Sequence, residues 1–419
     1  MTSAEPPSAL ERMLHGVAAD TFVQRHWGRR AGHFPGPRER LRSIYELSDW
    51  QALRYVGAVD AAVRDQTGRQ QQVAADPRQI PALLTAGMTI CADVSSQPTL
   101  AAFLAALVAE LRISSGEPPF GKLYASPDAA GFAMHMDAHH VFVLQLEGQK
   151  TWWYGDEPAL PWTLSNGKVD PHGRAVLTGP RDGEPMLDEL DRPIDPPAAS
   201  SLQEVTLRPG DCLYLPPGTW HMTRARGSSV ALSISPPRAP ALHHLLDALE
   251  ERLLRVPAWR EDLVGMPADA DDPTAVPASV RDVITRRLRD LGRTALALDA
   301  RDLQRSWCQS VSRAAGREHE ASPTATPGPD RAARLRHAPG GFFHVLAPSD
   351  EMDGEAVFIY RGGIEWLFPA QALVFVRELG RHSSFVASDV LAWDPALDWA
   401  AAREVLAQLL AAGILISDG

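Results

Sequence analysis

The stretch HMDAHHVFVLQLEGQKTWW, residues 135–153, decides the fold. It opens with a His-x-Asp tripeptide and continues with apolar and aromatic residues that are typical of a β-strand. Residues two positions apart on a strand point to the same face, so His135 and Asp137 are expected to project together. Glu147 and Gly148 separate two apolar runs, and this pattern predicts a hairpin turn between two strands.

A third candidate ligand is His221, the last residue of LRPGDCLYLPPGTWH, residues 207–221. The Pro-Gly pairs in this stretch predict turns on either side of a short strand. Two imidazoles and one carboxylate on one side of a metal form the facial triad of non-haem Fe(II) oxygenases, which leaves the other side open for a co-substrate and dioxygen. A His-x-Asp tripeptide alone is usually a chance occurrence, and the nearby His139 and His140 are competing imidazoles.

The composition indicates an ordinary globular protein. The 419 residues are 45% hydrophobic and 22% charged, which excludes a disordered or collagen-like chain and allows two or three domains. The net charge of −11 disfavours binding to nucleic acid through the overall field. No apolar run is long enough to span a membrane and residues 1–12 lack a secretory pattern, so no membrane partner is expected.

Two residue types are scarce. The cysteines are far apart and odd in number, which excludes a disulfide framework and a cysteine-based zinc site and favours a reducing compartment. We therefore expect a cytoplasmic protein in which Cys212 is buried rather than reactive. The three cysteines are Cys91, Cys212 and Cys308, and the 3 lysines among the 41 basic residues are Lys122, Lys150 and Lys168.

The pattern of elements predicts three successive parts and a linker. Apolar residues at helical spacing mark residues 99–111, and strand patterns follow from 120 to 153 and from 201 to 235. The segment 155–205 is rich in Pro, Gly, Asp and Glu and predicts a surface insertion. The predicted parts are a first domain at 1–240, a helical segment at 241–315, a linker at 316–330 and a last domain at 331–419 that ends in a helix and a short strand after Gly413.

In this order the motifs resemble the bacterial cupin-type Jumonji-C oxygenases, whose best-known members are the ribosomal oxygenases. The similarity covers roughly residues 22–235. After His-x-Asp come the family patterns F-x-L-Q-x-x-G-x-K-x-W and P-G-D-x-L-Y-x-P-x-x-x-x-H, both present here in order. A weaker match is FVQRHWGRRAGHFPG, residues 22–36, which is similar to the entry segment of the family.

The resemblance implies an α+β fold: a double-stranded β-helix of cupin or jelly-roll type, then a helical dimerisation segment and a C-terminal winged helix. It also implies hydroxylation that depends on 2-oxoglutarate and Fe(II). The implied iron ligands are His135, Asp137 and His221. Because the metal and the co-substrate carry out the chemistry in this family, no catalytic acid or base is expected from the protein.

The resemblance further implies which residues bind the co-substrate. Lys150 would pair with the distal carboxylate of 2-oxoglutarate, since a buried dianion requires a cation. Tyr124 would add a hydroxyl to the same site. Lys122 stands where the family usually has an amide, so it is either a third co-substrate contact or a lysine that faces solvent. Lys150 itself has the alternative of being a solvated hairpin lysine.

By the same resemblance the substrate is a polypeptide side chain, in a ribosomal protein or a ribosomally made peptide precursor, and the protein is a homodimer. Residues 326–419 hold 7 Arg, no Lys and 12 acidic residues, so the last domain is better suited to docking a peptide than to binding nucleic acid. Hydroxylation of a nucleic-acid base or a small metabolite, and metal binding without catalysis, stay as alternatives. Four tryptophans could line a substrate groove but are expected to pack: Trp152, Trp153, Trp162 and Trp220.

Overall fold

The structure is a computed structural model of the chain. Residues 316–327, most of the predicted linker, lie outside its described residues. The contacts divide the chain into two compact units, Met1–Arg238 and Ala239–Gly419. The described residues are 8–45, 59–64, 70–179, 194–264, 276–314, 328–338, 344–346, 355–360, 364–395 and 397–417.

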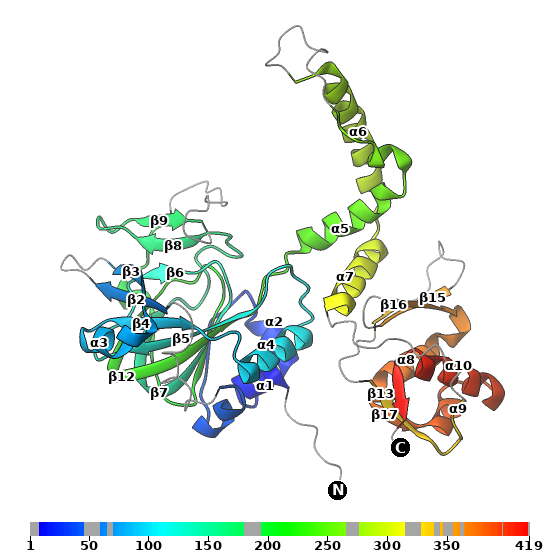
Figure 1. Cartoon of the computed structure of the whole chain (residues 1–419), viewed down its shortest axis with the longest axis horizontal. Coiled ribbons are helices and arrows are strands. Elements are labelled where there is room, and N and C mark those ends of the chain that lie inside the picture. The colour runs from blue at the N-terminus through cyan, green and yellow to red at the C-terminus, as the bar shows by residue number, and fades with distance from the viewer. Residues whose placement is uncertain are drawn as a thin grey trace. The chain divides into compact units, whose positions relative to one another are not determined.

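Two long strands organise the first unit. β7 (Val141–Tyr154) and β12 (His221–Ser235) pair with each other in antiparallel fashion. Their register shifts between Arg226 and Ser229 and again after Val230. Because such β-bulges bend and twist a strand pair, the two halves of the pair take part in two different layers of sheet (Figure 1).

The hairpin turn predicted at Glu147 and Gly148 is wrong. β7 runs through both residues, and Gly148, with a φ of 61°, lies opposite Ser229 at the bulge. A Cβ atom on Gly148 would come within 1.8 Å of the Ser228 carbonyl oxygen, so this position requires glycine. Gln145 supports the same bend by donating from Nε2 to the Ser229 hydroxyl at 2.9 Å.

The first layer contains one half of the β7–β12 pair in the strand order β1-β11-β7-β12-β5-β4-β2-β3, with all neighbours antiparallel. Its remaining strands are β1 (Gly32–Phe34), β2 (Val59–Arg64), β3 (Gln70–Ala75), β4 (Thr89–Asp93), β5 (Phe120–Ser126) and β11 (Cys212–Leu215).

The second layer contains the other half of the pair, with β10 beside β7 and β6, β8 and β9 beyond β12. The segment 155–205 is therefore more than a surface insertion, because its described part adds three strands to this layer; residues 180–193 lie outside the described part. The strands are β6 (His135–Met136), β8 (Asn166–Val169), β9 (Ala175–Thr178) and β10 (Gln203–Leu207).

The two layers face each other across a small apolar cluster. We call the face that each layer turns toward the other its inner face. Strand residues alternate between faces, so each strand contributes every second side chain to this cluster. The first layer contributes Val141, Val143, Leu213, Leu215 and Ala231, and the second contributes Trp152, Tyr154 and Leu207.

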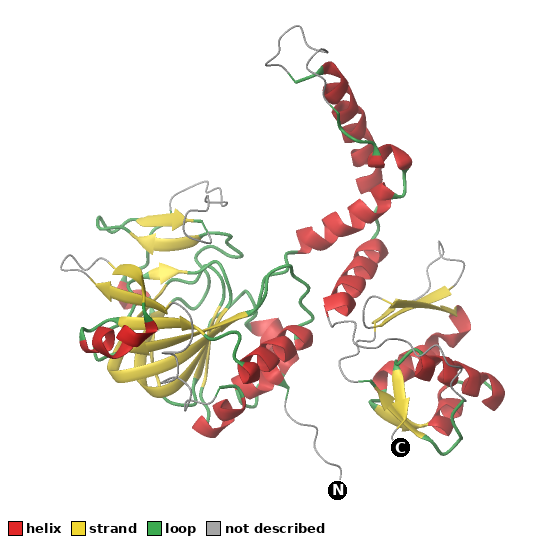
Figure 2. Ribbon diagram, viewed as in Figure 1, coloured by secondary structure: helices red, strands yellow, loops and turns green. Residues whose placement is uncertain are grey.

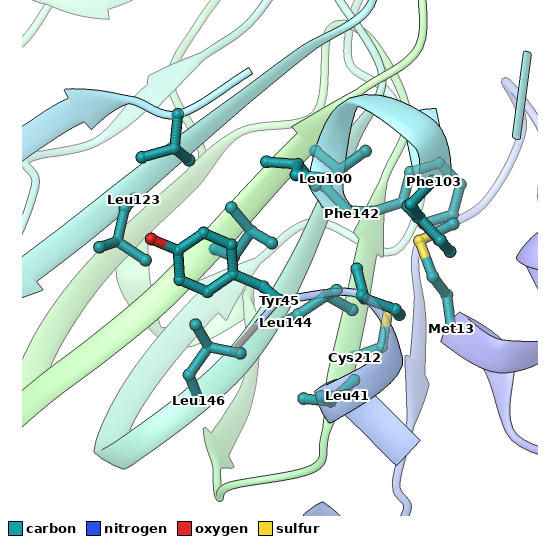
Figure 3. Packing of buried hydrophobic residues seen from close by; sticks show 14 of the residues in the cluster. Met13, Leu41, Tyr45, Leu100, Phe103, Leu123, Phe142, Leu144, Leu146 and Cys212 are labelled. Atoms are coloured by element: carbon teal, nitrogen blue, oxygen red, sulfur yellow. The ribbon is translucent and has the colours of Figure 1, made fainter. Parts of the chain in front are cut away.

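The larger core lies on the other face of the first layer, under helices. Phe142, Leu144 and Leu146 of β7 point there and pack with Leu100 and Phe103 (Figure 3). Fully burying side chains of this size contributes roughly 1.5–3 kcal/mol each. The helices of this unit are α1 (Ala9–Leu14), α2 (Ala19–Arg25), α3 (Ile80–Thr85) and α4 (Pro98–Glu110), with a 3₁₀ helix η1 (Arg38–Ser43).

The second unit starts with three helices, which confirms the helical prediction for residues 241–315 in their described part (Figure 2). They are α5 (Ala241–Leu254), α6 (Ala278–Leu296) and α7 (Ala300–Ala314). Apolar side chains stay exposed on α5 and α6, among them Leu242, Leu246, Leu288 and Leu296.

The last part of the chain combines short strands with helices around its own core of buried apolar residues. β13 (Arg334–His337) pairs with β17 (Ser384–Val386) and β18 (Leu415–Ser417), and β15 (Glu355–Tyr360) pairs with β14 (His344–Leu346) and β16 (Ile364–Pro369). The predicted ending, a helix and then a strand after Gly413, is confirmed by α10 (Trp399–Ala411) and β18. The other helices are α8 (Leu373–Arg381) and α9 (Val390–Trp393). None of the described helices has the length and apolarity needed to cross a membrane.

Candidate metal centre

The three candidate ligands come together on the second layer. His135 begins β6, Asp137 follows that strand directly, and His221 begins β12. His135 and His221 are cross-strand partners with ring centroids 4.1 Å apart, and His221 Nε2 lies 3.6 Å from Asp137 Oδ2. One ligand atom from each of the three residues lies within 4.8 Å of the others.

Backbone carbonyls orient both imidazoles. His135 Nδ1 lies 2.7 Å from the Ala133 oxygen and His221 Nδ1 lies 2.9 Å from the Thr219 oxygen. Since a carbonyl only accepts, each Nδ1 carries the proton and each Nε2 keeps a free lone pair, the usual arrangement in metal-binding histidines. Burial also lowers the pKa of His221 to about 4, which keeps this imidazole neutral.

Asp137 is ionised and held in place. Burial alone would raise the pKa of its carboxyl group, but the neighbouring His139, His135 and His221 bring that pKa below its ordinary value. The Asp137 carbonyl accepts the Gly218 N–H at 2.8 Å. Two imidazoles and one carboxylate form a donor set that fits Fe(II).

The competing imidazoles, those of His139 and His140, have contacts outside the group of candidate metal ligands. His140 is buried, stacks on Trp27 at 3.8 Å between ring centroids and hydrogen-bonds the Tyr214 hydroxyl at 2.8 Å. His139 packs against the edge of Phe120 at 5.2 Å. Neither belongs to the group of three ligand atoms found among the described residues.

Lys150 lies on the inner face and is 2% exposed. Its Nζ donates to the Ser126 hydroxyl of the first layer at 2.9 Å and lies 5.8 Å from the Phe132 ring centroid. Burial lowers the pKa of Lys150 to about 8. Within the described part of the chain no carboxylate pairs with this ammonium. Because Lys150 is buried, it is not the solvated hairpin lysine that the sequence left open as an alternative.

Tyr124 and Lys122 share the inner face of β5 with Ser126, because the three positions alternate along one strand. Tyr124 packs edge-on against Phe132 at 5.6 Å, and Phe132 lies 6.0 Å from the His135 ring. Lys122 is half-buried, and its Nζ lies 5.5 Å from the Phe120 ring. Ser126, and not Lys122, is thus the residue of β5 that Lys150 contacts.

The tryptophans mostly pack, as expected. Trp152 stacks on His221 at 5.7 Å, Trp220 is 2% exposed, and Trp153 donates from Nε1 to the Glu204 carboxylate at 3.0 Å. Trp162 differs, because about half of it (49%) is exposed. Cys212 is buried as predicted, and all three cysteines are free.

Four further residues support the site and were not predicted from the sequence. Ser126 had a signal, because it lies two positions after Tyr124 and therefore on the same face. Phe132 gave no such signal. Asn166 accepts the Ala138 N–H at 2.8 Å, and Arg238 donates to the Ala138 carbonyl at 3.1 Å, so both hold the residue that follows Asp137. They are distant in sequence, and only the fold brings them there.

Residues 104–245 match the family model of the JmjC domain. An antiparallel cupin-type sheet with helices, a JmjC domain and a His-Asp-His cluster define a cupin-type JmjC oxygenase, an enzyme that uses Fe(II) and 2-oxoglutarate. The α+β cupin fold, the enzyme class and the two cofactors expected from the sequence are thereby confirmed.

Similar proteins are found in bacteria and animals. The uncharacterized protein YxbC of Bacillus subtilis is 26% identical over 275 residues, 62% of this chain and 80% of that protein. Ribosomal oxygenase 1 of Rattus norvegicus is 30% identical over 243 residues, which cover 54% of this chain but only 36% of the rat protein. Among solved structures, the Escherichia coli ribosomal oxygenase YcfD in complex with cobalt and 2-oxoglutarate matches with a TM-score of 0.43 and 17% identity, covering 96% of this chain and 99% of that one.

Proposed function

We propose that this chain hydroxylates a side chain of a protein or of a ribosomally made peptide, with His135, Asp137 and His221 as the iron ligands. One observation carries the proposal: three ligand atoms within 4.8 Å of one another share a sheet face with a buried lysine that pairs with no described carboxylate. A buried ammonium without a counter-ion costs several kcal/mol, and a dianionic co-substrate removes that cost when it binds.

The residues around the metal bind and orient the co-substrate. Lys150 receives its distal carboxylate, with Ser126 as the second hydrogen-bonding group. Tyr124 provides a hydroxyl on the same face, and Phe132 excludes water between Lys150 and His135. When bound, Fe(II) and 2-oxoglutarate supply the oxidation, in which one oxygen atom enters a C–H bond and the other converts the co-substrate to succinate and carbon dioxide.

A polypeptide substrate is supported by the names of the relatives and by the second unit. The rat relative is named a ribosomal oxygenase. We propose that residues 331–419 form a winged-helix-like domain that docks a peptide, and that residues 241–315 form a dimerisation segment in a cytoplasmic homodimer. The exposed leucines of α5 and α6 support the dimer, since an isolated helix rarely leaves so much apolar surface in water.

Mass spectrometry of candidate substrates tests the proposal. Co-expression with a ribosomal protein or a precursor peptide should add one oxygen atom, about 16 Da, to a single residue, and His135→Ala should abolish the addition. The product should be accompanied by at least an equal amount of succinate. If a nucleoside or a metabolite gains the oxygen atom and no polypeptide does, the alternative substrate class is correct.

The other alternative, a metal-binding cupin without catalysis, is tested without any substrate. Oxygenases of this class slowly turn over 2-oxoglutarate alone when iron is present. Purified protein with Fe(II) and 2-oxoglutarate should therefore form succinate. Absence of succinate under these conditions, with metal and co-substrate both shown to bind, would favour the non-catalytic cupin.

A further inference from the structure

The three lysines of this chain are not scattered over its surface. The other 38 of its 41 basic residues are arginines, and those form nearly all of the described ion pairs, for example Arg30 with Asp156. Lys150, Lys122 and Lys168 instead lie on strands β7, β5 and β8, which surround the metal centre. Lysine is a compact point charge, whereas arginine is a planar fork, so the two are not interchangeable at a binding site.

Lys168 lies on the same face as the metal ligands. It is the direct cross-strand partner of His135, and His135 is the partner of His221. Directly opposed residues of an antiparallel pair point to the same side of the sheet. One row on the second layer therefore contains His221, His135 and Lys168, and it ends at β9 with Val176. Lys168 and Val176, at the edge of this row, are exposed.

Lys122 faces the same centre from the first layer. It lies on the inner face of β5, next to Phe120, whose ring is also packed against His139. Lys150 contacts Ser126, which lies four positions after Lys122 on β5. Roughly 13 Å of strand therefore separates Lys122 from the residue that Lys150 contacts.

No ion pair of the described residues involves a lysine. Asp93 lies directly opposite Lys122, but its carboxylate accepts the N–H and the hydroxyl of Ser95 at 2.9 and 2.6 Å. Asp93 is exposed and forms no ion pair with Lys122, so solvent screens its charge and it offsets that of Lys122 only weakly.

The sum of the formal charges around the metal centre indicates which charge a substrate group would have there. With Fe(II), the Asp137 carboxylate, dianionic 2-oxoglutarate and the Lys150 ammonium in place, the formal charges cancel. Lys122, half-buried, and Lys168, exposed, then add two positive charges that no ion pair of the described residues compensates. Partial burial makes an unpaired cation less favourable, and an opposite charge beside it removes part of that cost. An acidic group of the substrate would supply this opposite charge.

We propose that Lys122 and Lys168 form a carboxylate-binding subsite, so the side chain that this enzyme oxidises is that of an aspartate or a glutamate in an acidic peptide segment. This inference rests on the proposed function, because it assigns the partner of the same metal centre. Lys122 binds the carboxylate of the target residue itself. Lys168, exposed at the edge, attracts acidic residues that flank the target. The resemblance implies a contact of Lys122 with 2-oxoglutarate, and in this proposal Lys122 contacts the substrate instead.

The experiment uses the full chain in a form that binds but does not react, with Mn(II) in place of iron and saturating N-oxalylglycine in place of 2-oxoglutarate. The probes are N-acetylaspartate N-methylamide and the matched neutral N-acetylasparagine N-methylamide. Paramagnetic broadening of their side-chain methylene protons by Mn(II) measures binding close to the metal. We expect the aspartate probe to bind about tenfold or more tightly than the asparagine probe, the usual effect of a hydrogen bond to a charged group.

Variants identify the lysines responsible. Lys122→Met should abolish the preference for aspartate, and Lys122→Arg should retain part of it. Lys168→Met should weaken binding by a smaller factor that disappears at high salt, since an exposed charge is screened. The matched control is Arg224→Met, which removes an exposed cation from the strand of His221 but from its opposite face. Arg224→Met should change nothing.

The binding of N-oxalylglycine separates the two proposals. If it binds the wild-type chain and Lys122→Met, both proteins are folded and the co-substrate site is intact, so an equal affinity for the two probes overturns the carboxylate subsite alone. No binding of either probe, or tighter binding of a phosphoserine analogue, would overturn it as well. If N-oxalylglycine fails to bind the Mn(II) protein at all, the proposed function itself is wrong.

Discussion

His135 and His221 lie directly opposite each other on neighbouring antiparallel strands, with their ring centroids 4.1 Å apart. This pairing brings two candidate ligands that are distant in sequence to one face of one sheet. Asp137 joins them because it follows β6 directly. The metal centre thus depends on the register of two strands, and a shift of one residue would turn one imidazole to the opposite face.

Alanine substitutions of the ligands should each remove the metal. For His135→Ala, Asp137→Ala and His221→Ala we expect the affinity for Mn(II) to fall by more than the roughly 10–100-fold that is usual for losing a supporting residue. Equilibrium dialysis against Mn(II) measures this. His139→Ala is the matched control and should keep the metal; if it lost the metal while His221→Ala kept it, the ligand assignment would be wrong.

Removing the buried lysine should affect the co-substrate and leave the metal bound. Lys150→Ala is expected to weaken 2-oxoglutarate binding by about 2–5 kcal/mol, the usual loss when one partner of a buried charge pair is removed. Lys150→Arg should be intermediate, because the guanidinium keeps the charge and changes the geometry. Titration of 2-oxoglutarate onto the Mn(II) protein checks both. Unchanged affinity in Lys150→Ala would mean that another cation binds the distal carboxylate.

The affinity for 2-oxoglutarate should decrease at alkaline pH. Burial lowers the pKa of Lys150 to about 8 in the free protein, so the ammonium that binds the co-substrate is lost as the pH rises through that value. Above it we expect affinity to fall by about tenfold per pH unit, because one proton must be taken up on binding. Calorimetric titrations between pH 7 and about 9.5 measure this. A flat profile would indicate that the lysine stays protonated throughout.

The exposed apolar side chains of α5 should hold a dimer together. Leu246 is 50% exposed in the single chain, and covering such residues with a second copy removes apolar surface from water. Sedimentation velocity at micromolar concentration should give a dimer for the wild type and a monomer for Leu246→Glu. Glu250→Gln, a change at an exposed position of the same helix, should leave the dimer intact. A wild-type monomer under these conditions would argue against the dimer.

The core of the first unit should be sensitive to truncation at β7. Phe142 is fully buried, so Phe142→Ala is expected to lower the free energy of unfolding by about 3–5 kcal/mol. Val176 is exposed at the edge of the second layer, and Val176→Ala should change stability by less than about 0.5 kcal/mol. Denaturant unfolding of the two variants and the wild type compares them. Similar losses in both would mean that burial does not distinguish these positions.

Local pattern was enough to predict the candidate ligands, and the family resemblance carried by the same motifs implied the class of enzyme. His135 and Asp137 are two positions apart on a strand, and the period of two brings them to one face whatever surrounds them. The motifs that contain Lys150 and His221 are also continuous stretches, so their residue types and spacing could be read directly. The helices of residues 241–315 were predictable for the same reason, since apolar spacing reports a helix locally.

Tertiary structure decided everything that depends on which strands meet. The Glu147-Gly148 pair predicted a turn, and only the packing of β12 against β7 made it a bulge, because the ladder continues on both sides of Gly148. The sequence alone does not show to which face of the sheet the Lys122 side chain points. It lies on the inner face because β5 pairs with β12 in one register, and Lys168 lies on the face of the metal ligands because β8 pairs with β6 at His135. The register of paired strands is set by the burial of apolar side chains over whole layers. A short motif covers only a small part of a layer and therefore cannot predict the register.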